Sequence, residues 1–400
     1  MSGKERNCRP SNNEGETVHR FNWNTPFLIS PHDPSVIWMG GQYVFRLTER
    51  GDRWERVSPD LTTWDARKSS TGGSGAEAHC TIVSLTESTV KAGVVWAGTD
   101  DGKVWVSPTG GGAWTDVTRN IRGIPAGLYV SRIEASHRDA QTAYVCFDGH
   151  RSDVFSPWLF VTHDLGQSWT NLSAGLPKDH TVKVVREDPQ NPSLLFAGTE
   201  FGLFVSLDAG KTWLPWKHGL PTVAVDDIAV HPRERDLLVA THGRGLYVLD
   251  GIHILEQWNA TSLTDSVQFA PPRAAWAYYE RALGGKWGQG EWLGKNPPFG
   301  AWFDYFLPRK IEGGVSIAVA DSAGREVRKL TGSGEEGFHR VAWDLVAGDP
   351  RDRVRLDESA GQDEFVSPGS YKVTLTAGKA RPIGRTVEVR AVPGTHKTGL

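Results

Sequence analysis

The sequence predicts an all-β protein, with five blade-like units of a β-propeller in an incomplete ring, followed by a β-sandwich. Three observations predict this fold. One turn sequence recurs ahead of four tryptophans, and short segments rich in β-branched and aromatic residues recur between these turns. Residues 299–392 then alternate apolar and polar side chains between regularly spaced turns.

The recurring turn is clearest at residues 206–213, which read Ser-Leu-Asp-Ala-Gly-Lys-Thr-Trp. An Asp side chain can accept hydrogen bonds from backbone amides just ahead of it, and glycine takes a positive φ at low steric cost. The tryptophan then buries a large ring between neighbouring units. The four tryptophans are 60, 55 and 44 residues apart, a spacing typical of propeller blades. The predicted structural residues of these turns are Asp208, Gly210 and Trp213; Asp164, Gly166 and Trp169; Gly111 and Trp114; and Gly51 and Trp54.

Each unit has a second strand that is short, apolar and bounded by turn residues. These predicted strands are 36–40, 94–98, 143–147, 194–198 and 237–241. The fifth unit lacks the turn and its tryptophan, as expected of a terminal repeat. Because the chain begins almost directly inside a repeat, we expect one or more upstream blades to be missing from it. A closed five-bladed ring is the alternative.

Composition changes divide the chain into segments. Residues 1–18 are polar and are interpreted as a disordered lead, 19–250 as propeller blades, and 393–400 as a tail. Residues 251–298 form a linker that is rich in aromatic residues, and 299–392 an Ig-like sandwich. The linker aromatics either attach it to both domains or offer a surface for stacking on sugars. They are Trp276, Tyr278, Tyr279, Trp287 and Trp292.

The turn residues resemble the Asp-box (BNR) repeat of sialidases, of xyloglucanase-like glycoside hydrolases and of the sortilin (VPS10-like) luminal domain. In that resemblance the box lies at the blade edge, away from the active face. Residues 337–345 and 368–375 resemble Ig-like modules of the FlgD type. Residues 21–26, 132–136, 147–153 and 241–245 resemble the C-terminal half of large bacterial sortilin-like BNR-repeat "glycosyl hydrolase" proteins. This resemblance implies an extracytoplasmic location, periplasmic or secreted, although no signal peptide is recognised in the chain.

Composition excludes several classes of function. A formal net charge of −3 gives no electrostatic case for binding nucleic acid or an anionic membrane, and no apolar run reaches the length of a membrane span. Three scattered cysteines indicate no disulfide framework. The sequence has no P-loop, no His-Glu-x-x-His, no Gly-x-Ser-x-Gly and no zinc-type cysteine pair. We therefore predict no cofactor and no metal.

Ligands of propellers usually bind at the mouth of the central channel, where inner strands and the loops after second strands converge. Alignment of the second strands places Asp100, Glu200 and His242 at one common position. Mixed acids and bases at such a mouth can bind a polar ligand, or they can pair with one another and seal the channel. The candidate ligand-binding residues are Arg132, Glu134, His150, Arg151, Asp153, Arg186, His242, Arg244 and Asp100.

Two functions are consistent with these patterns. The first is a binding or scaffold module for a peptide or glycan ligand, by resemblance to sortilin-like propellers. The alternative is a glycoside hydrolase of the xyloglucanase or sialidase type, whose two carboxylates would stand about 5–5.5 Å apart for retention or about 6.5–9.5 Å for inversion. Glu200 with Asp226 or Asp148 is the candidate catalytic pair.

Overall fold

The computed structural model describes residues 7–12, 15, 17–65, 68, 78–217, 219–257, 266–278, 297–348 and 365–392 of the 400. The chain divides into two compact units, Met1–Glu256 and Gln257–Leu400. The predicted tail, 393–400, and the linker residues Tyr279, Trp287 and Trp292 lie outside the described residues.

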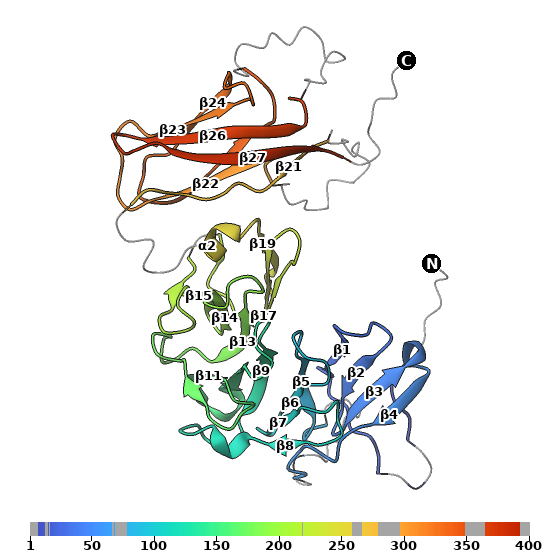
Figure 1. The fold of residues 1–400 in the computed structure, drawn as a ribbon. Helices are drawn as coiled ribbons and strands as arrows, with labels where there is room; N and C mark the ends of the chain where they lie inside the picture. Colours follow the sequence, from blue (N-terminus) through green and yellow to red (C-terminus); the bar gives the residue numbers. More distant parts are fainter. Residues whose placement is uncertain are drawn as a thin grey trace, which may run out of the picture. The chain divides into compact units, whose positions relative to one another are not determined.

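The first unit consists of five antiparallel sheets, each built from strands that are consecutive in the chain. Figure 1 shows these blades following one another along an arc, with β1–β4 at one end and β17–β19 at the other. Blade 1 contains β1 (Phe27–Ile29), β2 (Ile37–Gly40), β3 (Val44–Thr48) and β4 (Arg53–Arg56), and blade 2 contains β5 (Ile82–Glu87), β6 (Val95–Thr99), β7 (Val104–Ser107) and β8 (Thr115–Asp116). Blade 3 contains β9 (Tyr129–Ala135), β10 (Ala143–Gly149), β11 (Val154–Thr162) and β12 (Thr170–Asn171).

Blade 4 contains β13 (Val182–Glu187), β14 (Leu195–Thr199), β15 (Gly202–Ser206) and β16 (Leu214–Pro215). Blade 5 has three strands, β17 (Val225–Val230), β18 (Leu237–Thr241) and β19 (Gly245–Leu249), followed by the short helix α2 (His253–Gln257). Three 3-10 turns occupy Glu49–Gly51, Thr118–Asn120 and His150–Ser152. The predicted all-β fold with five blade-like units is confirmed, and each predicted second strand matches β2, β6, β10, β14 or β18 within two residues.

The blades hold together by packing face to face. Every residue of β6, β10 and β14 is buried, because one face of each sheet covers the preceding blade and the other face covers the next. Separate apolar cores fill the successive interfaces. Trp38 and Ala97 belong to the core between blades 1 and 2, Trp96 and Ile133 to that between blades 2 and 3, and Trp213 to that between blades 3 and 4.

The recurring turn is held by side-chain hydrogen bonds. In blade 4 the Gly210 amide donates to Ser206 Oγ (2.8 Å), and Ser206 Oγ donates to Asp208 Oδ1 (2.8 Å). Asp208 also accepts from the Thr212 amide (2.9 Å) and hydroxyl (2.7 Å). Ala209 and Gly210 both have positive φ, 58° and 85°. The side chain of Asp208 therefore fixes two successive left-handed residues, which otherwise favour glycine.

In blades 2–4 the glycine of the turn lies against the preceding blade. A Cβ on Gly111 would lie 2.6 Å from Val57 Cβ, and one on Gly166 or Gly210 would lie 2.8 Å from Val117 or Leu172. Those three residues each directly follow the outer strand of the preceding blade, β4, β8 or β12. The turn is consequently part of the blade interface.

The second unit is a two-sheet sandwich. One sheet has the order β20 (Gln268–Phe269), β22 (Ala301–Leu307), β25 (Gly337–Trp343), and the other has the order β21 (Ala275–Ala277), β27 (Ile383–Ala391), β26 (Gly369–Ala377), β23 (Val315–Ala320), β24 (Glu326–Gly332). Alternate residues of both sheets, among them Phe303, Ile317, Trp343 and Val373, form one apolar core. The Ig-like and FlgD-type assignments of this unit stay predictions.

We expect Asp208→Ala to destabilise the protein by about 1–2 kcal/mol, because the turn loses hydrogen bonds that each contribute about 1 kcal/mol net. Lys211→Ala is the matched control at an exposed residue of the same turn, and it should change stability by less than about 0.5 kcal/mol. Urea unfolding followed by tryptophan fluorescence measures both. Equal stability of the two variants would contradict this role of Asp208.

Candidate functional site

The central residue of the candidate site is Lys183, the second residue of β13. Its Nζ lies 2.8 Å from Glu200 Oε2, 3.3 Å from Asp148 Oδ2 and 4.0 Å from Asp226 Oδ1. Asp148 comes from blade 3, Lys183 and Glu200 from blade 4, and Asp226 from blade 5. We call these four residues, with His150 and His242, the Lys183 cluster.

A β-bulge in each inner strand of blades 2–5 sets the positions of these side chains. In β13 both Val182 and Val184 pair with consecutive residues of β14, so Lys183 is the extra residue of a bulge. Asp226 has the same place in β17. The equivalent extra residues of blades 2 and 3 are Val83 and Ser131. A bulge residue lies outside the regular pairing and re-aims its side chain, which explains why adjacent blades direct Lys183 and Asp226 to one place.

Asp148 lies where β10 ends. Gly149 follows it, and a Cβ there would lie 2.5 Å from the carbonyl oxygen of Val154, so only glycine allows the chain to fold back this closely. His150 then begins a 3-10 turn, and Asp153, with a φ of 57°, ends it. His150 Nδ1 lies 2.7 Å from Asp148 Oδ1, and the His150 amide donates to the same oxygen at 3.0 Å. The loop after β10 therefore fixes the Asp148 carboxylate through the backbone amide of His150.

The remaining members of the cluster lie nearer to solvent. Glu200 directly follows β14, and its amide donates to the carbonyl of Thr181 (3.1 Å). His242 Nδ1 lies 3.1 Å from Asp226 Oδ2. Asp148 is buried, Lys183 and Glu200 are partly buried, and Asp226 and His242 are exposed. The cluster is thus anchored in the interior and open at its outer side.

The pKa values follow from these contacts. Burial alone would lower the pKa of Lys183, but the hydrogen bond to Glu200 and the charges of Asp148, Glu200 and Asp226 outweigh it and raise that pKa. Burial alone would raise the pKa of Asp148, but the hydrogen bonds from His150 and the charge of Lys183 outweigh it and lower that pKa. Asp148 is therefore an anion at neutral pH, unsuited to the role of a general acid.

A second group of charges lies further along the inner strands. Arg186 contacts Glu134 and donates to Asp227 Oδ1 (3.0 Å), which also lies 2.8 Å from Arg132 Nη2. Burial raises the pKa of Glu134, but the Arg186 charge and the contacts with His137 outweigh it and lower that pKa. These arginines and carboxylates neutralise one another across blades 3, 4 and 5, a pattern that favours a role in sealing the channel.

The other predicted site residues lie apart from both groups. Asp100 is buried and accepts from the Thr81 amide (2.9 Å) and hydroxyl (2.7 Å), and burial is the main cause that raises its pKa. The Arg151 guanidinium stacks over the Tyr129 ring at 5.0 Å. Arg244 is exposed on the turn between β18 and β19.

Sequence reasoning missed Lys183, the central residue of the first group. Lys183 follows a valine and precedes two more, a pattern that predicts an ordinary buried strand. Alignment of the inner strands would have placed Lys183, Ser131 and Asp226 at one position.

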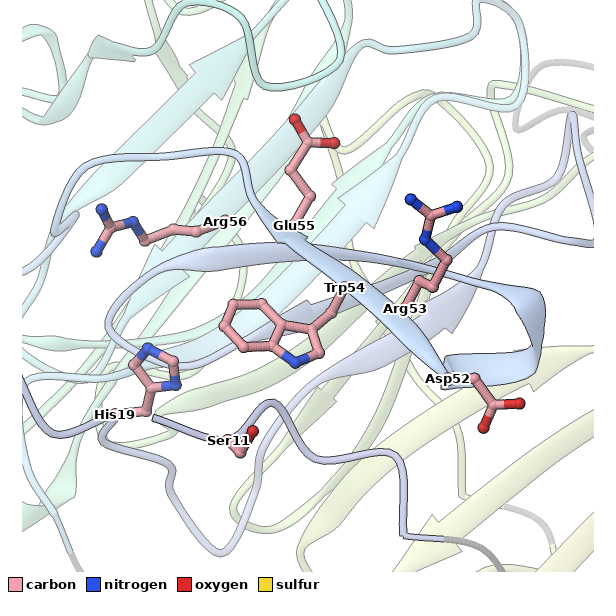
Figure 2. Close-up of a pocket in the computed structure, with 7 residues that line it drawn as sticks. All are labelled: Ser11, His19, Asp52, Arg53, Trp54, Glu55 and Arg56. Atoms are coloured by element: carbon pink, nitrogen blue, oxygen red, sulfur yellow. The ribbon is translucent and has the colours of Figure 1, made fainter. Parts of the chain in front are cut away.

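Two further features concern the described residues as a whole. No group of three or more His, Cys, Asp or Glu side chains there is arranged to hold a metal ion, and no helix there is long and apolar enough to cross a membrane. A cavity of about 560 Å³ lies on blade 1, far in sequence from the Lys183 cluster. Figure 2 shows its lining, with the His19 ring beside the Trp54 indole and Arg53, Glu55 and Arg56 around them.

No family model matches this sequence, and no curated protein sequence matches it either. Several solved structures are similar in fold. A GH74 xyloglucanase from Xanthomonas campestris is 16% identical, over 90% of this chain and 56% of that chain, with a TM-score of 0.45. PorZ, a surface component of the type-IX secretion system of Porphyromonas gingivalis, is 14% identical, over 90% and 51%, with a TM-score of 0.42. An ancestral GH74 enzyme is 14% identical, over 84% and 41%, with a TM-score of 0.44. This chain spans about half the length of these proteins.

We expect Lys183→Met to destabilise the protein by up to about 3 kcal/mol near neutral pH, because it leaves Asp148 buried without its cation. The lowered pKa of Asp148 stabilises the fold above its unfolded-state pKa of about 4, and this contribution is lost as the pH falls through the folded-state pKa. Without Lys183 the folded-state pKa rises, so the difference between variant and wild type should shrink below about pH 4.

Urea unfolding at a series of pH values measures this difference. The double variant Asp148→Asn/Lys183→Met is the control, and it should recover part of the lost stability because no buried charge is left unpaired. A difference that stays constant from neutral to acid pH would show that Asp148 and Lys183 are not coupled.

Proposed function

We propose that this chain is a propeller binding module of the sortilin-like, BNR-repeat type, which holds a polar ligand, a peptide or a glycan, at the Lys183 cluster. One observation carries the proposal. Carboxylates from three consecutive blades meet at one ammonium group, and their exposure rises from Asp148 outward to Asp226. Such a site has a buried carboxylate, Asp148, and more exposed carboxylates that a ligand can reach.

The charge of the cluster indicates the chemistry of the ligand. Three carboxylates face one lysine, so the cluster has an excess of acceptors and of negative charge. Ligand ammonium groups and hydroxyl groups both donate hydrogen bonds to carboxylates, and bonds to charged groups are the stronger ones. A peptide bearing lysine, or the hydroxyls of a glycan, fits this requirement.

Isothermal titration calorimetry with two soluble probes tests the proposal: a tri-lysine amide and a xyloglucan heptasaccharide. We expect one of them to bind, and Glu200→Gln and Asp226→Asn each to weaken that binding about 10- to 100-fold, since each removes a hydrogen bond to a charged group. Glu326→Gln, at an exposed carboxylate on β24 of the second unit, is the control and should bind as wild type does. Unchanged binding in both cluster variants would refute the proposal, as would failure of both probes to bind.

The alternative, a glycoside hydrolase, also has a specific observation in its favour. Glu200 and Asp226 come from adjacent blades and lie 2.8 Å and 4.0 Å from the same Nζ, so two carboxylates stand near one another, as glycoside hydrolysis requires. Under this alternative Glu200→Gln abolishes release of reducing sugar from xyloglucan while leaving binding of the heptasaccharide measurable. Under the binding-module proposal the wild type releases none.

The proposed site of action is outside the cytoplasm, periplasmic or secreted. The resemblance of the repeats and of the sandwich to extracytoplasmic bacterial proteins supports this location. Fractionation of the native host, with detection by an antibody to the sandwich unit, tests it. Recovery of the protein only in the cytoplasmic fraction would contradict it.

A further inference from the structure

Among the described residues of the first unit, the two ends of the arc of blades have exposed apolar faces. On blade 5, Leu246 and Val248 of β19 are 75% and 55% exposed. The residues at the same positions of blade 4, Leu203 and Val205, are only 2% and 6% exposed, because blade 5 covers them. The outer face of blade 5 thus has the composition of a blade interface without the next blade.

Blade 1 exposes the other kind of face, the one by which each later blade packs on the blade before it. Phe27 and Ile29 of β1 are 71% and 61% exposed. Of the residues that match Phe27 on later inner strands, Ile133, Val185 and Ile228 are buried. Leu85 of blade 2 is partly buried against the core between blades 1 and 2. Phe27 and Ile29 therefore belong to a face that, in every later blade, meets a preceding blade.

The interface between blades 2 and 3 shows how two faces of these kinds pack together. Between blades 2 and 3, Val104 and Val106 match Leu246 and Val248, and Ile133 matches Phe27. Val104, Val106 and Ile133 belong to one buried core. The exposed face of blade 5 is thus equivalent to the face of blade 2 that packs on blade 3. The exposed face of blade 1 is equivalent to the face of blade 3 that packs on blade 2.

The edges match as well as the faces. Within the described residues β19 pairs only with β18, so blade 5 lacks the fourth strand that blades 1–4 have. On blade 1, a Cβ on Gly51 would lie 2.6 Å from Cys8 Cβ. Cys8 thus takes the place that Val57, Val117 and Leu172 take next to the later turns. The segment before blade 1 occupies the position of a preceding blade's outer edge, where blade 5 is incomplete.

We propose that blade 5 of one copy of this chain binds blade 1 of a second copy, head to tail. Leu246 and Val248 pack against Phe27 and Ile29, and the segment around Cys8 lies along the open edge of β19. An unpaired edge strand and an uncovered apolar face both favour association. Because the two surfaces differ, the contact is heterologous and closes into a ring of copies or continues as an open chain.

The test is light scattering after size-exclusion chromatography of the full chain, at a series of concentrations. We expect the wild type to self-associate as concentration rises. The double variants Leu246→Glu/Val248→Glu and Phe27→Glu/Ile29→Glu each spoil one of the two faces, and each should weaken self-association at least about 30-fold. Val90→Glu, at an exposed apolar residue of blade 2, is the matched control and should associate as the wild type does.

A mixing experiment separates a lost interface from a lost fold. Each double variant keeps the face that the other lacks, so an equimolar mixture should form a one-to-one pair. Misfolded variants cannot give this result. A wild type that stays a single chain at every concentration would overturn the proposal and would favour blades from another polypeptide as the partner. Double variants that associate like the wild type, or a mixture without pairs, would also overturn it.

Discussion

Burial of each blade between two neighbours is the constraint on which the rest of this structure depends. An isolated sheet of three or four short strands cannot cover both of its apolar faces, so its stability comes from the adjacent sheets. This is why β6, β10 and β14 are buried at every position and do not alternate between apolar and polar residues. The same packing brings inner strands of successive blades close together, so charges on them come within reach of one another.

The features predictable from the sequence are those that repeat. The second strands and the turn with Asp208 could be aligned because each blade solves the same packing problem with similar residues. Alignment of the loops likewise anticipated Glu200 and Asp148. Alignment of the inner strands would also have grouped Lys183 with Asp226, but the flanking valines give no sign of the bulge that turns Lys183 out of the β13 pairing. The pairing of Arg186 with Glu134 and Asp227 depends on distances between blades, which no local pattern contains.

The candidate site and the incomplete end of the arc share blade 5. Asp226 and His242 belong to this blade, whose outer face is uncovered and whose sheet has one strand fewer than the others. A sheet with fewer buried contacts opens locally at a lower free energy. Whatever covers Leu246 and Val248 therefore also steadies the outer rim of the Lys183 cluster. The proposed assembly and the proposed ligand binding would therefore be thermodynamically linked through this one blade.

The bulges of the inner strands place one side chain per blade outside the regular strand pairing. The extra residue of a bulge is left out of the ladder, so its side chain is not required to pack in either blade interface. The four bulges already hold an aliphatic residue, a hydroxyl, a cation and an anion, at Val83, Ser131, Lys183 and Asp226, on otherwise similar strands. The same strand geometry thus accommodates four different kinds of side chain at equivalent positions. In this sense the propeller is a ready framework for selecting new binding specificities.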